Sequence, residues 1–446
     1  MRFAGLTLAV LCVLGSATAM AQQTPADTSP DADEAAHSKL PLDEIRRFVA
    51  VYNAVRQAYV DPVDDDKLMH SAIHGLLQEL DPHSTYFDKA DAEAFDEETS
   101  GAYDGIGVEL QLLPDNTLKV IAPIDDTPAA RAGILAGDVI VAIDGKPIAE
   151  TGGSEPLRGE AGTEVVLSVL REHQDKPLQI HVKRDTIHIT SVRSKMLEPG
   201  FGYIRISSFQ ADTGSDFETH LQQLQQQSAG QLKGLVLDLR SNPGGLLTAA
   251  VQVADDLLES GGIVSTRGRT PISDSSFNAT PGDLLQGAPL VVLVDAGSAS
   301  ASEVLSGALH DHQRARIVGS RTFGKGSVQT LLPLDNGDSV KLTTARYYTP
   351  SGRSIQASGI VPDVVLKPAA GKAADDDGID YSEAALPGHL RGDDEGDEGY
   401  TAGDALPGEA PVQAALKELK QMVSNPAARP AQPPLKPVAT PADATP

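Results

Sequence analysis

The chain has 446 residues, and at about 100–200 residues per domain this length predicts two to four domains. Apolar residues make up 40 % of the chain, which is enough to bury sizeable cores. The 62 acidic residues against 36 basic ones leave a net charge of −26, which repels phosphate backbones and anionic lipid and so excludes nucleic-acid binding. Cys12 is the only cysteine, which leaves no disulfide framework, thiolate zinc site or cysteine nucleophile.

Residues 1–21 have the pattern of a signal peptide. Arg2 supplies the positive start, residues 6–14 form an apolar run, and residues 19–21 (AMA) offer a small-x-small cleavage site. The apolar run is too short to cross a bilayer core of about 30 Å as a helix. We therefore expect an exported protein of the periplasm or cell envelope that is soluble once the signal peptide has been removed.

The next segments differ in the period of their apolar residues. After a polar linker over 22–38, the apolar residues of 39–98 recur at three- and four-residue intervals, which predicts an N-terminal helical region. Residues 99–185 instead show short alternating strands around one short helix at 127–134, which is typical of a small β-rich module. The strands expected in this module span 105–113, 118–124, 138–145, 164–171 and 178–184.

Residues 186–368 alternate strands with helices, which predicts an α/β layer with parallel pairing at least in its centre. The expected strands span 202–209, 234–240, 289–295, 315–320, 327–334 and 339–348. The expected helices span 212–227, 247–260 and 300–312.

The pattern fails after residue 368. Between residues 375 and 409 twelve acidic residues stand against one basic residue, Arg391, so the segment 369–410 is predicted to be acidic and disordered. A short helix over 411–424 and a Pro/Ala-rich tail over 425–446 complete the chain.

Residues 291–310 (VVLVDAGSASASEVLSGALH) join an apolar strand to a helix through three alternating serines. A serine at such a junction lies beside free amide donors and the positive end of the helix dipole. There the Ser300 hydroxyl can attack a carbonyl while the next amide, that of Ala301, holds an oxyanion. The run from Ser300 to Glu303 is also a capping box, and these residues alone favour that structural interpretation.

Residues 319–329 (GSRTFGKGSVQ) nearly match a phosphate-binding loop. Gly326 stands where Ser or Thr would hold magnesium, however, and a strand follows instead of a helix, so this interpretation fails. A lysine between two glycines can be held in a narrow, dry place, where burial lowers its pKa and makes Lys325 a candidate general base. A hairpin-like loop with a solvated lysine is the simpler alternative, and this motif alone favours it.

Residues 238–245 (DLRSNPGG) directly follow an apolar strand. The amides of consecutive glycines form a concave anion site, although a plain strand-to-helix turn explains them equally well. No G-x-S-x-G motif of the usual catalytic triad is present, and His310 and His312 are interpreted as surface or packing residues. No histidine and carboxylate spacing suggests a metal site, and no cofactor is expected.

Six motifs together resemble the carboxy-terminal processing (tail-specific) serine peptidases, which have an embedded PDZ domain. The motifs are LDPHSTYF, GYIRISSF, DLRSNPGG, GSASASEV, GSRTFGKGSVQ and TARYYTPSGRSIQASGIVPD, and the resemblance spans about residues 40–368. It implies a multidomain α/β and β fold, in which a PDZ domain at 99–185 is inserted before an α/β (crotonase-like) peptidase core at 186–368.

The resemblance also implies roles for individual residues. It places the nucleophile at Ser300 and the general base at Lys325, with Gln329 holding that lysine and Glu303 in a supporting role. The oxyanion donors that it implies are the amides of Ala301 and of Gly244 or Gly245. A desolvated lysine can then shuttle the proton that histidine carries in other serine peptidases.

In the β-rich module, Gly105, Ile106, Gly107 and Val108 resemble the carboxylate-binding loop of a PDZ domain. The amides of such a loop bind a chain terminus while the next strand pairs with an extended peptide. A β-rich module that only packs is the plainer interpretation. Arg158 matches a family arginine that links the position of the PDZ domain to the protease site, and we expect the inserted domain to be a gate as well as a tether.

We therefore expect an exported serine endopeptidase that recognises the C-terminal tails of envelope proteins through its PDZ domain and cleaves them. The alternative is a catalytically idle PDZ adaptor or scaffold of the envelope, which the intact set of Ser300, Lys325 and Gln329 disfavours. The expected partners are substrates with accessible C-terminal tails, an adaptor protein and further copies of the chain. The acidic residues 371–409 are predicted to be dispensable for hydrolysis.

Overall fold

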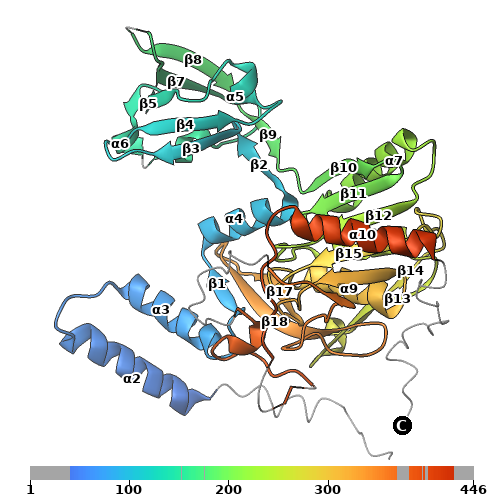
Figure 1. Cartoon of the computed structure of the whole chain (residues 1–446). Coiled ribbons are helices and arrows are strands. Elements are labelled where there is room, and N and C mark those ends of the chain that lie inside the picture. Colours follow the sequence, from blue (N-terminus) through green and yellow to red (C-terminus); the bar gives the residue numbers. More distant parts are fainter. Residues whose placement is uncertain are drawn as a thin grey trace, which may run out of the picture. The chain divides into compact units, whose positions relative to one another are not determined.

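The computed structural model describes residues 41–151, 153–174, 176–368, 381–393, 395–396 and 400–425 (Figure 1). The predicted signal peptide, the linker and nearly all of the Pro/Ala-rich tail lie outside these residues. The chain divides into two compact units after His70. Among the described residues, no helix is long and apolar enough to cross a membrane.

The predicted N-terminal helical region contains helix α2 (Leu42–Ala58) and helix α3 (Asp65–Gln78). Asp43 and Glu44 in the first turn of α2 complement the positive end of the helix dipole. Strand β1 (Thr85–Phe87) and helix α4 (Lys89–Ser100) follow. The Asp88 side chain caps α4 by accepting a hydrogen bond from the Asp91 amide.

The β-rich module is an antiparallel sheet with the order β3-β4-β5-β7-β8, and β6 pairs with β5. Its alternating apolar residues face inward and are almost completely buried, as the side chains of Val120, Ile140 and Val165 show. At its entry and exit, β2 (Ala102–Gly105) pairs with β9 (Asp185–His188). The other elements are β3 (Val108–Leu112), β4 (Leu118–Pro123), α5 (Pro128–Arg131), β5 (Val139–Ile143), β6 (Lys146–Pro147), α6 (Ile148–Thr151), β7 (Glu164–Leu170) and β8 (Leu178–Lys183).

The α/β core contains a sheet with the order β10-β11-β12-β15-β16-β19. Strand β10 is antiparallel to β11, and the remaining pairs are parallel, as the alternation of strands and helices predicts. The strands are β10 (Val192–Glu198), β11 (Phe201–Ile206), β12 (Gly234–Asp238), β15 (Leu290–Val294), β16 (Ala315–Gly319) and β19 (Val364–Val365).

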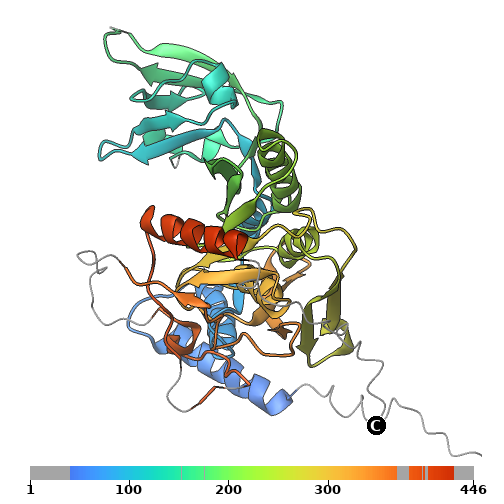
Figure 2. The same ribbon diagram turned by 45° about the vertical axis from the view of Figure 1, so that its right-hand side comes forward.

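Helices cover both faces of this sheet. Leu235, Leu237 and their neighbours pack against α7 (Thr213–Gln227), α8 (Leu247–Leu257) and α9 (Ala301–Asp311). Val236 points to the opposite face and packs against α10 (Ala410–Ser424), which lies along the sheet in Figures 1 and 2. The continuous apolar run of β12 is explained by this burial on both sides.

A second, antiparallel sheet was not expected. It has the order β1-β18-β13-β14, with β17 paired to β18, and it contains the predicted strands β17 (Ser327–Pro333) and β18 (Ser339–Tyr348). The predicted α/β layer with parallel strands in its centre is present, but β17 and β18 belong to this separate antiparallel sheet. Strands β13 (Gly261–Gly268) and β14 (Ser275–Ala279) were missed because polar and glycine residues interrupt their apolar pattern.

The expectation of disorder over 369–410 is wrong where the segment is described. Ser382 and Glu383 are buried, and Glu383 accepts hydrogen bonds from the side chains of His83 and Gln356. Leu406 is also buried, and its carbonyl accepts a hydrogen bond from the Arg240 guanidinium. The acidic composition predicted too little ordered structure here, because a few apolar and carboxylate side chains of the segment have partners on the core. Residues 369–380 lie outside the described residues.

Candidate active site

Ser300 lies at the junction between strand β15 and helix α9, in an unusual backbone conformation. Its φ of 53° and ψ of −113° place a non-glycine residue outside the common regions, and such conformations cluster at functional sites. The Ser300 amide donates to Glu303 Oε2 over 2.8 Å, which is one half of the predicted capping box. The serine therefore begins the helix and lies beside the Ala301 amide, while the next two amides, of Ser302 and Glu303, donate to the carbonyls of Ala299 and Ser300.

The Glu303 carboxylate binds the main chains of both predicted catalytic segments. Its Oε2 accepts the Ser300 amide and, over 2.9 Å, the Lys325 amide. Its Oε1 accepts the Gly324 amide over 2.7 Å and the hydroxyl of Thr322. Burial raises the pKa of Glu303 to about 7, against the hydrogen bonds that lower it. One buried carboxylate thus brings together two segments that the sequence could only consider separately.

The Lys325 amine is bound by Gln329, as the resemblance implied. Lys325 Nζ donates to Gln329 Oε1 over 2.6 Å. Burial, and then the positive charge of Lys341, lower the pKa of Lys325 to about 8. Lys325 is half-buried and bonded to a side chain, which disfavours the alternative of a solvated lysine in a hairpin loop. In the described part of the chain the amine is bonded to Gln329 and not to Ser300, and catalytic hydrogen bonds often tighten only when substrate binds.

The glycine that follows Lys325 is required by a close backbone approach. A Cβ atom on Gly326 would lie 2.2 Å from the Gln356 amide nitrogen, and the Gly326 amide donates to Gln356 Oε1 over 2.9 Å. The Gly324 carbonyl accepts the amide of Ala357 over 2.9 Å. Close packing against Gln356 therefore explains the glycine that makes this segment resemble a phosphate-binding loop.

The Asn-Pro-Gly-Gly turn packs directly on the serine segment. The carbonyl of Asn242 accepts the Ala299 amide over 3.0 Å and the Ser302 hydroxyl over 3.0 Å. The Gly244 amide donates to Asn242 Oδ1 over 2.9 Å, so it is not free for an oxyanion. Among the described residues, no acceptor is recorded for the amides of Ala301 and Gly245, the other two predicted donors.

The aromatic side chain beside Ser300 was not predicted. Tyr347 is buried on strand β18, and burial raises the pKa of its hydroxyl to about 12, against a hydrogen bond with Ser300. Its amide donates to the Gly326 carbonyl over 2.8 Å. Tyr347 lies in the motif TARYYTPSGRSIQ, and no local sequence pattern assigns this tyrosine to the serine.

His310 of α9 and His312, the residue that caps its C-terminus, both have partners other than Ser300. Asp311 and Asp363 raise the pKa of His310 to about 9, against burial. His312 Nε2 lies 2.6 Å from the Gly262 carbonyl. Both side chains contact groups other than Ser300.

The loop of residues 105–108 in the β-rich module presents free amides. Gly107 has a φ of 73°, and its carbonyl accepts the Thr127 hydroxyl over 3.0 Å. The Ile106 carbonyl accepts the Ala129 amide over 2.8 Å, and the Ile106 side chain is buried. In the part of the chain that the structure describes, the amides of Ile106 and Gly107 have no recorded acceptor. This arrangement fits a loop that binds a chain-terminal carboxylate.

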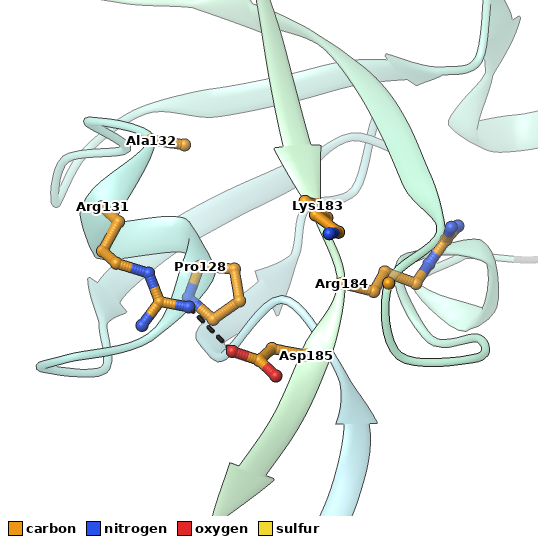
Figure 3. Close-up of a pocket in the computed structure, with 7 residues that line it drawn as sticks. Pro128, Arg131, Ala132, Lys183, Arg184 and Asp185 are labelled. Atoms are coloured by element: carbon orange, nitrogen blue, oxygen red, sulfur yellow. Dashed lines mark hydrogen bonds and ion pairs between the residues drawn. The ribbon is translucent and has the colours of Figure 1, made fainter.

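A pocket of about 380 Å³ lies beside this loop but does not include it. Figure 3 shows Arg131 of α5 reaching Asp185, and the two side chains form an ion pair of 2.9 Å. Lys183 and Arg184 line the pocket from the adjacent strand. Because Arg131 already has a carboxylate partner, the pocket is a weaker candidate for tail binding than the loop.

Arg158 is not joined to the serine and lysine segments in this structure. Its guanidinium is bonded to Glu97 of α4 and lies over the ring of Tyr103, 5.1 Å from the ring centroid. The relay role predicted for Arg158 therefore stays a prediction.

Comparison with known proteins gives matches over most of the chain. Residues 200–366 match peptidase family S41, residues 105–182 match a PDZ domain, and residues 4–91 match the N-terminal domain of the activating protease CtpB. A carboxy-terminal-processing protease of Bartonella bacilliformis is 42 % identical over 395 residues, which cover 88 % of this chain and 91 % of that protein. The carboxy-terminal processing protease CtpA of Bacillus subtilis is 36 % identical over 317 residues, or 70 % of this chain and 67 % of that protein. Among solved structures, a photosystem II D1 C-terminal processing protease is 32 % identical, with a TM-score of 0.42 over 72 % of this chain and 92 % of that chain.

Proposed function

Because this chain belongs to the carboxy-terminal processing proteases of peptidase family S41, we propose that Ser300 is its nucleophile and Lys325 its general base. The predictions of the family, of a serine-type peptidase and of a PDZ domain ahead of an α/β core are confirmed. The observation that carries the proposed dyad is the Glu303 carboxylate, whose Oε2 binds the amides of both residues.

The geometry supports a simple sequence of proton transfers. The neutral Lys325 amine takes the proton of the Ser300 hydroxyl as the serine oxygen attacks the scissile carbonyl. The negative oxygen is stabilised by the amides of Ala301 and Gly245. The Lys325 ammonium then protonates the leaving amine. In the second half of the reaction, Lys325 takes a proton from the water that attacks the acyl-enzyme and returns it to the Ser300 oxygen as the acid product leaves.

Substrate selection is proposed to begin at the PDZ domain. The free amides of Ile106 and Gly107 bind the terminal carboxylate of a substrate, and β3 (Val108–Leu112) pairs with the extended tail. The net charge of −26 favours tails without strong negative charge. We further propose that the protein is exported, that its substrates are envelope proteins, and that cleavage after Ala21 leaves a mature chain beginning at Gln22. N-terminal sequencing of the protein recovered from cell fractions tests this, and an intact Met1 in an envelope fraction contradicts the cleavage.

The dyad is tested by cleavage of fluorescein-labelled casein, an unstructured protein, by the full chain. Ser300→Ala and Lys325→Met are expected to abolish cleavage. Ser306→Ala is the matched control, because Ser306 is a buried serine of the same helix whose hydroxyl donates to the Ser302 carbonyl over 2.7 Å. Full activity in Ser300→Ala contradicts the proposal. No activity in the unaltered protein favours the idle adaptor.

A further inference from the structure

Asp81 is a buried carboxylate with four hydrogen-bond donors around it. It lies in the LDPHSTYF motif and is 3 % exposed. Its Oδ1 accepts the amides of His83 and Ser84 over 2.9 and 3.0 Å and the Thr343 hydroxyl over 3.0 Å, and its Oδ2 accepts the Ser84 hydroxyl over 2.7 Å. Burial raises the pKa of Asp81, but these hydrogen bonds outweigh it and the pKa is lowered, so the group is an ionised acceptor at neutral pH.

Thr343 connects this carboxylate to the lysine amine. A threonine hydroxyl has one hydrogen, and a carboxylate can only accept, so the hydrogen of Thr343 is used at Asp81. The lone pairs of Thr343 Oγ1 are then left to accept Gln329 Nε2 over 3.1 Å. Gln329 Nε2 also donates to the Ser327 hydroxyl over 3.1 Å, which uses the second amide hydrogen.

The direction of these bonds determines which end of the Gln329 amide faces Lys325. With both hydrogens of its nitrogen used, Gln329 presents Oε1 to Lys325 Nζ at 2.6 Å. A neutral amine has two N–H donors and one lone pair. If the amide were reversed, its NH2 group would donate to that lone pair and block the amine as a base. Oε1 instead accepts an N–H and leaves the lone pair available.

We propose that Asp81 is a positioning residue for the general base, acting through Thr343 and Gln329 on the Lys325 amine. The inference rests on the proposed dyad. It assigns to a motif 244 residues before the lysine a role in holding the amine in its productive orientation. Asp81 also adds negative charge near the amine, together with Glu383 and Glu303, whereas Lys341 acts in the opposite direction.

The competing explanation is that Asp81 only closes the turn of residues 81–84. Thr343→Val separates the two, because it removes the hydroxyl that leads to Gln329 and leaves the turn bonds to His83 and Ser84 intact. We expect Thr343→Val to lower kcat on labelled casein about tenfold or more with little change in KM. Thr343→Ser keeps the hydroxyl and is expected to restore activity to within about twofold of the unaltered protein.

Asp81→Asn is expected to lower kcat to a similar extent, since its amide can donate to Thr343 and reverse the chain of bonds. The double variant of Asp81→Asn and Thr343→Val is expected to have a kcat no lower than that of the less active single variant, because both substitutions break the same path. Ser84→Ala is the matched control: it removes a hydroxyl that donates to Asp81 Oδ2 and accepts the Thr343 amide over 3.1 Å, but it keeps the Thr343 hydroxyl between Asp81 and Gln329, and kcat is expected within about twofold. Thermal unfolding of each variant identifies any loss that comes from misfolding.

A normal kcat in Thr343→Val overturns the positioning role. So does a fall in kcat in the double variant that equals the product of the falls in the two single variants. Lys325→Met separates this outcome from a failure of the proposed function. If Lys325→Met is inactive while Thr343→Val is normal, the dyad stands and only the role of Asp81 is wrong. If Lys325→Met is active, the assignment of Lys325 as the base is wrong, and the positioning role of Asp81 is wrong as well.

Discussion

The proposal that Lys325 is the general base predicts a pH dependence of the activity. At a pKa of about 8, about one tenth of the amine is neutral at pH 7 and about half at pH 8. We expect kcat/KM to rise about fivefold between these pH values and to level off above pH 9. Lys341→Met removes a positive charge that lowers this pKa, and it should shift the rise to higher pH. A flat profile between pH 6 and 9 would contradict the assignment of Lys325 as the base.

The same shift affects stability. Below pH 8 lysine is charged in both the folded and the unfolded chain, and holding the charge in a buried site costs about 3 kcal/mol for a shift from 10.5 to about 8. Between pH 8 and 10.5 the unfolded chain binds more protons, so the stability of the folded state rises with pH. We expect Lys325→Met to unfold at an equal or higher temperature than the unaltered protein at pH 7, with the difference shrinking towards pH 10. A clearly lower melting temperature at pH 7 would identify Lys325 as a structural ion-pair partner.

Among the elements, helix α10 is part of the core although it follows the acidic segment. Leu419 is completely buried, and a Cβ atom on Gly234 of β12 would lie 2.8 Å from Leu419 Cδ1. Helix α10 therefore belongs to the folded core, whereas the prediction that residues 371–409 are dispensable for hydrolysis concerns the segment before it and stays a prediction. We expect Leu419→Ala to lower the free energy of unfolding by about 2–5 kcal/mol.

Lys417 is exposed on the same helix, and Lys417→Ala is the control, with an expected change within about 0.5 kcal/mol. Urea unfolding of both variants measures the difference. Equal stabilities would show that α10 packs only loosely against the sheet.

Across the whole molecule, tail binding and hydrolysis are expected to be separable. Gly107 has a φ of 73°, and a Cβ atom there would lie 2.4 Å from Thr127 Cβ. Gly107→Ala should therefore distort the loop and raise KM for substrates with a free C-terminal tail about tenfold or more, with little effect on kcat. Gly145→Ala is the matched control, since Gly145 has a φ of 76° and nothing within 4 Å of its Cβ position. Equal effects of the two variants would contradict tail recognition by residues 105–108.

Gating by the PDZ domain is a separate prediction at this scale. Arg158 is bonded to Glu97 of α4 in this structure, and a relay requires it to favour the arrangement in which the active site is complete. We expect Arg158→Ala to leave the affinity for a tail peptide nearly unchanged and to lower the turnover of casein about fivefold or more. Fluorescence anisotropy with a labelled tail peptide and the casein assay measure the two. Unchanged turnover contradicts the relay, and a matched loss of both makes Arg158 a binding residue only.

The sequence by itself determined the helical region, the β-rich module and the parallel strands of the core, because each is encoded in the period of its apolar residues over a short window. It also indicated Ser300, Lys325 and Gln329 as candidate catalytic residues, since six motifs together resemble one family. Only the tertiary structure decided which groups surround them. Asp81, Thr343 and Tyr347 reach the site through pairing of β1 with β18 and of β17 with β18, which joins residues far apart in the chain. Burial of Glu383, Leu406 and Leu419 is likewise decided by the surface they meet, because acidic composition describes the average solubility of a segment and not the partners that a few of its side chains find.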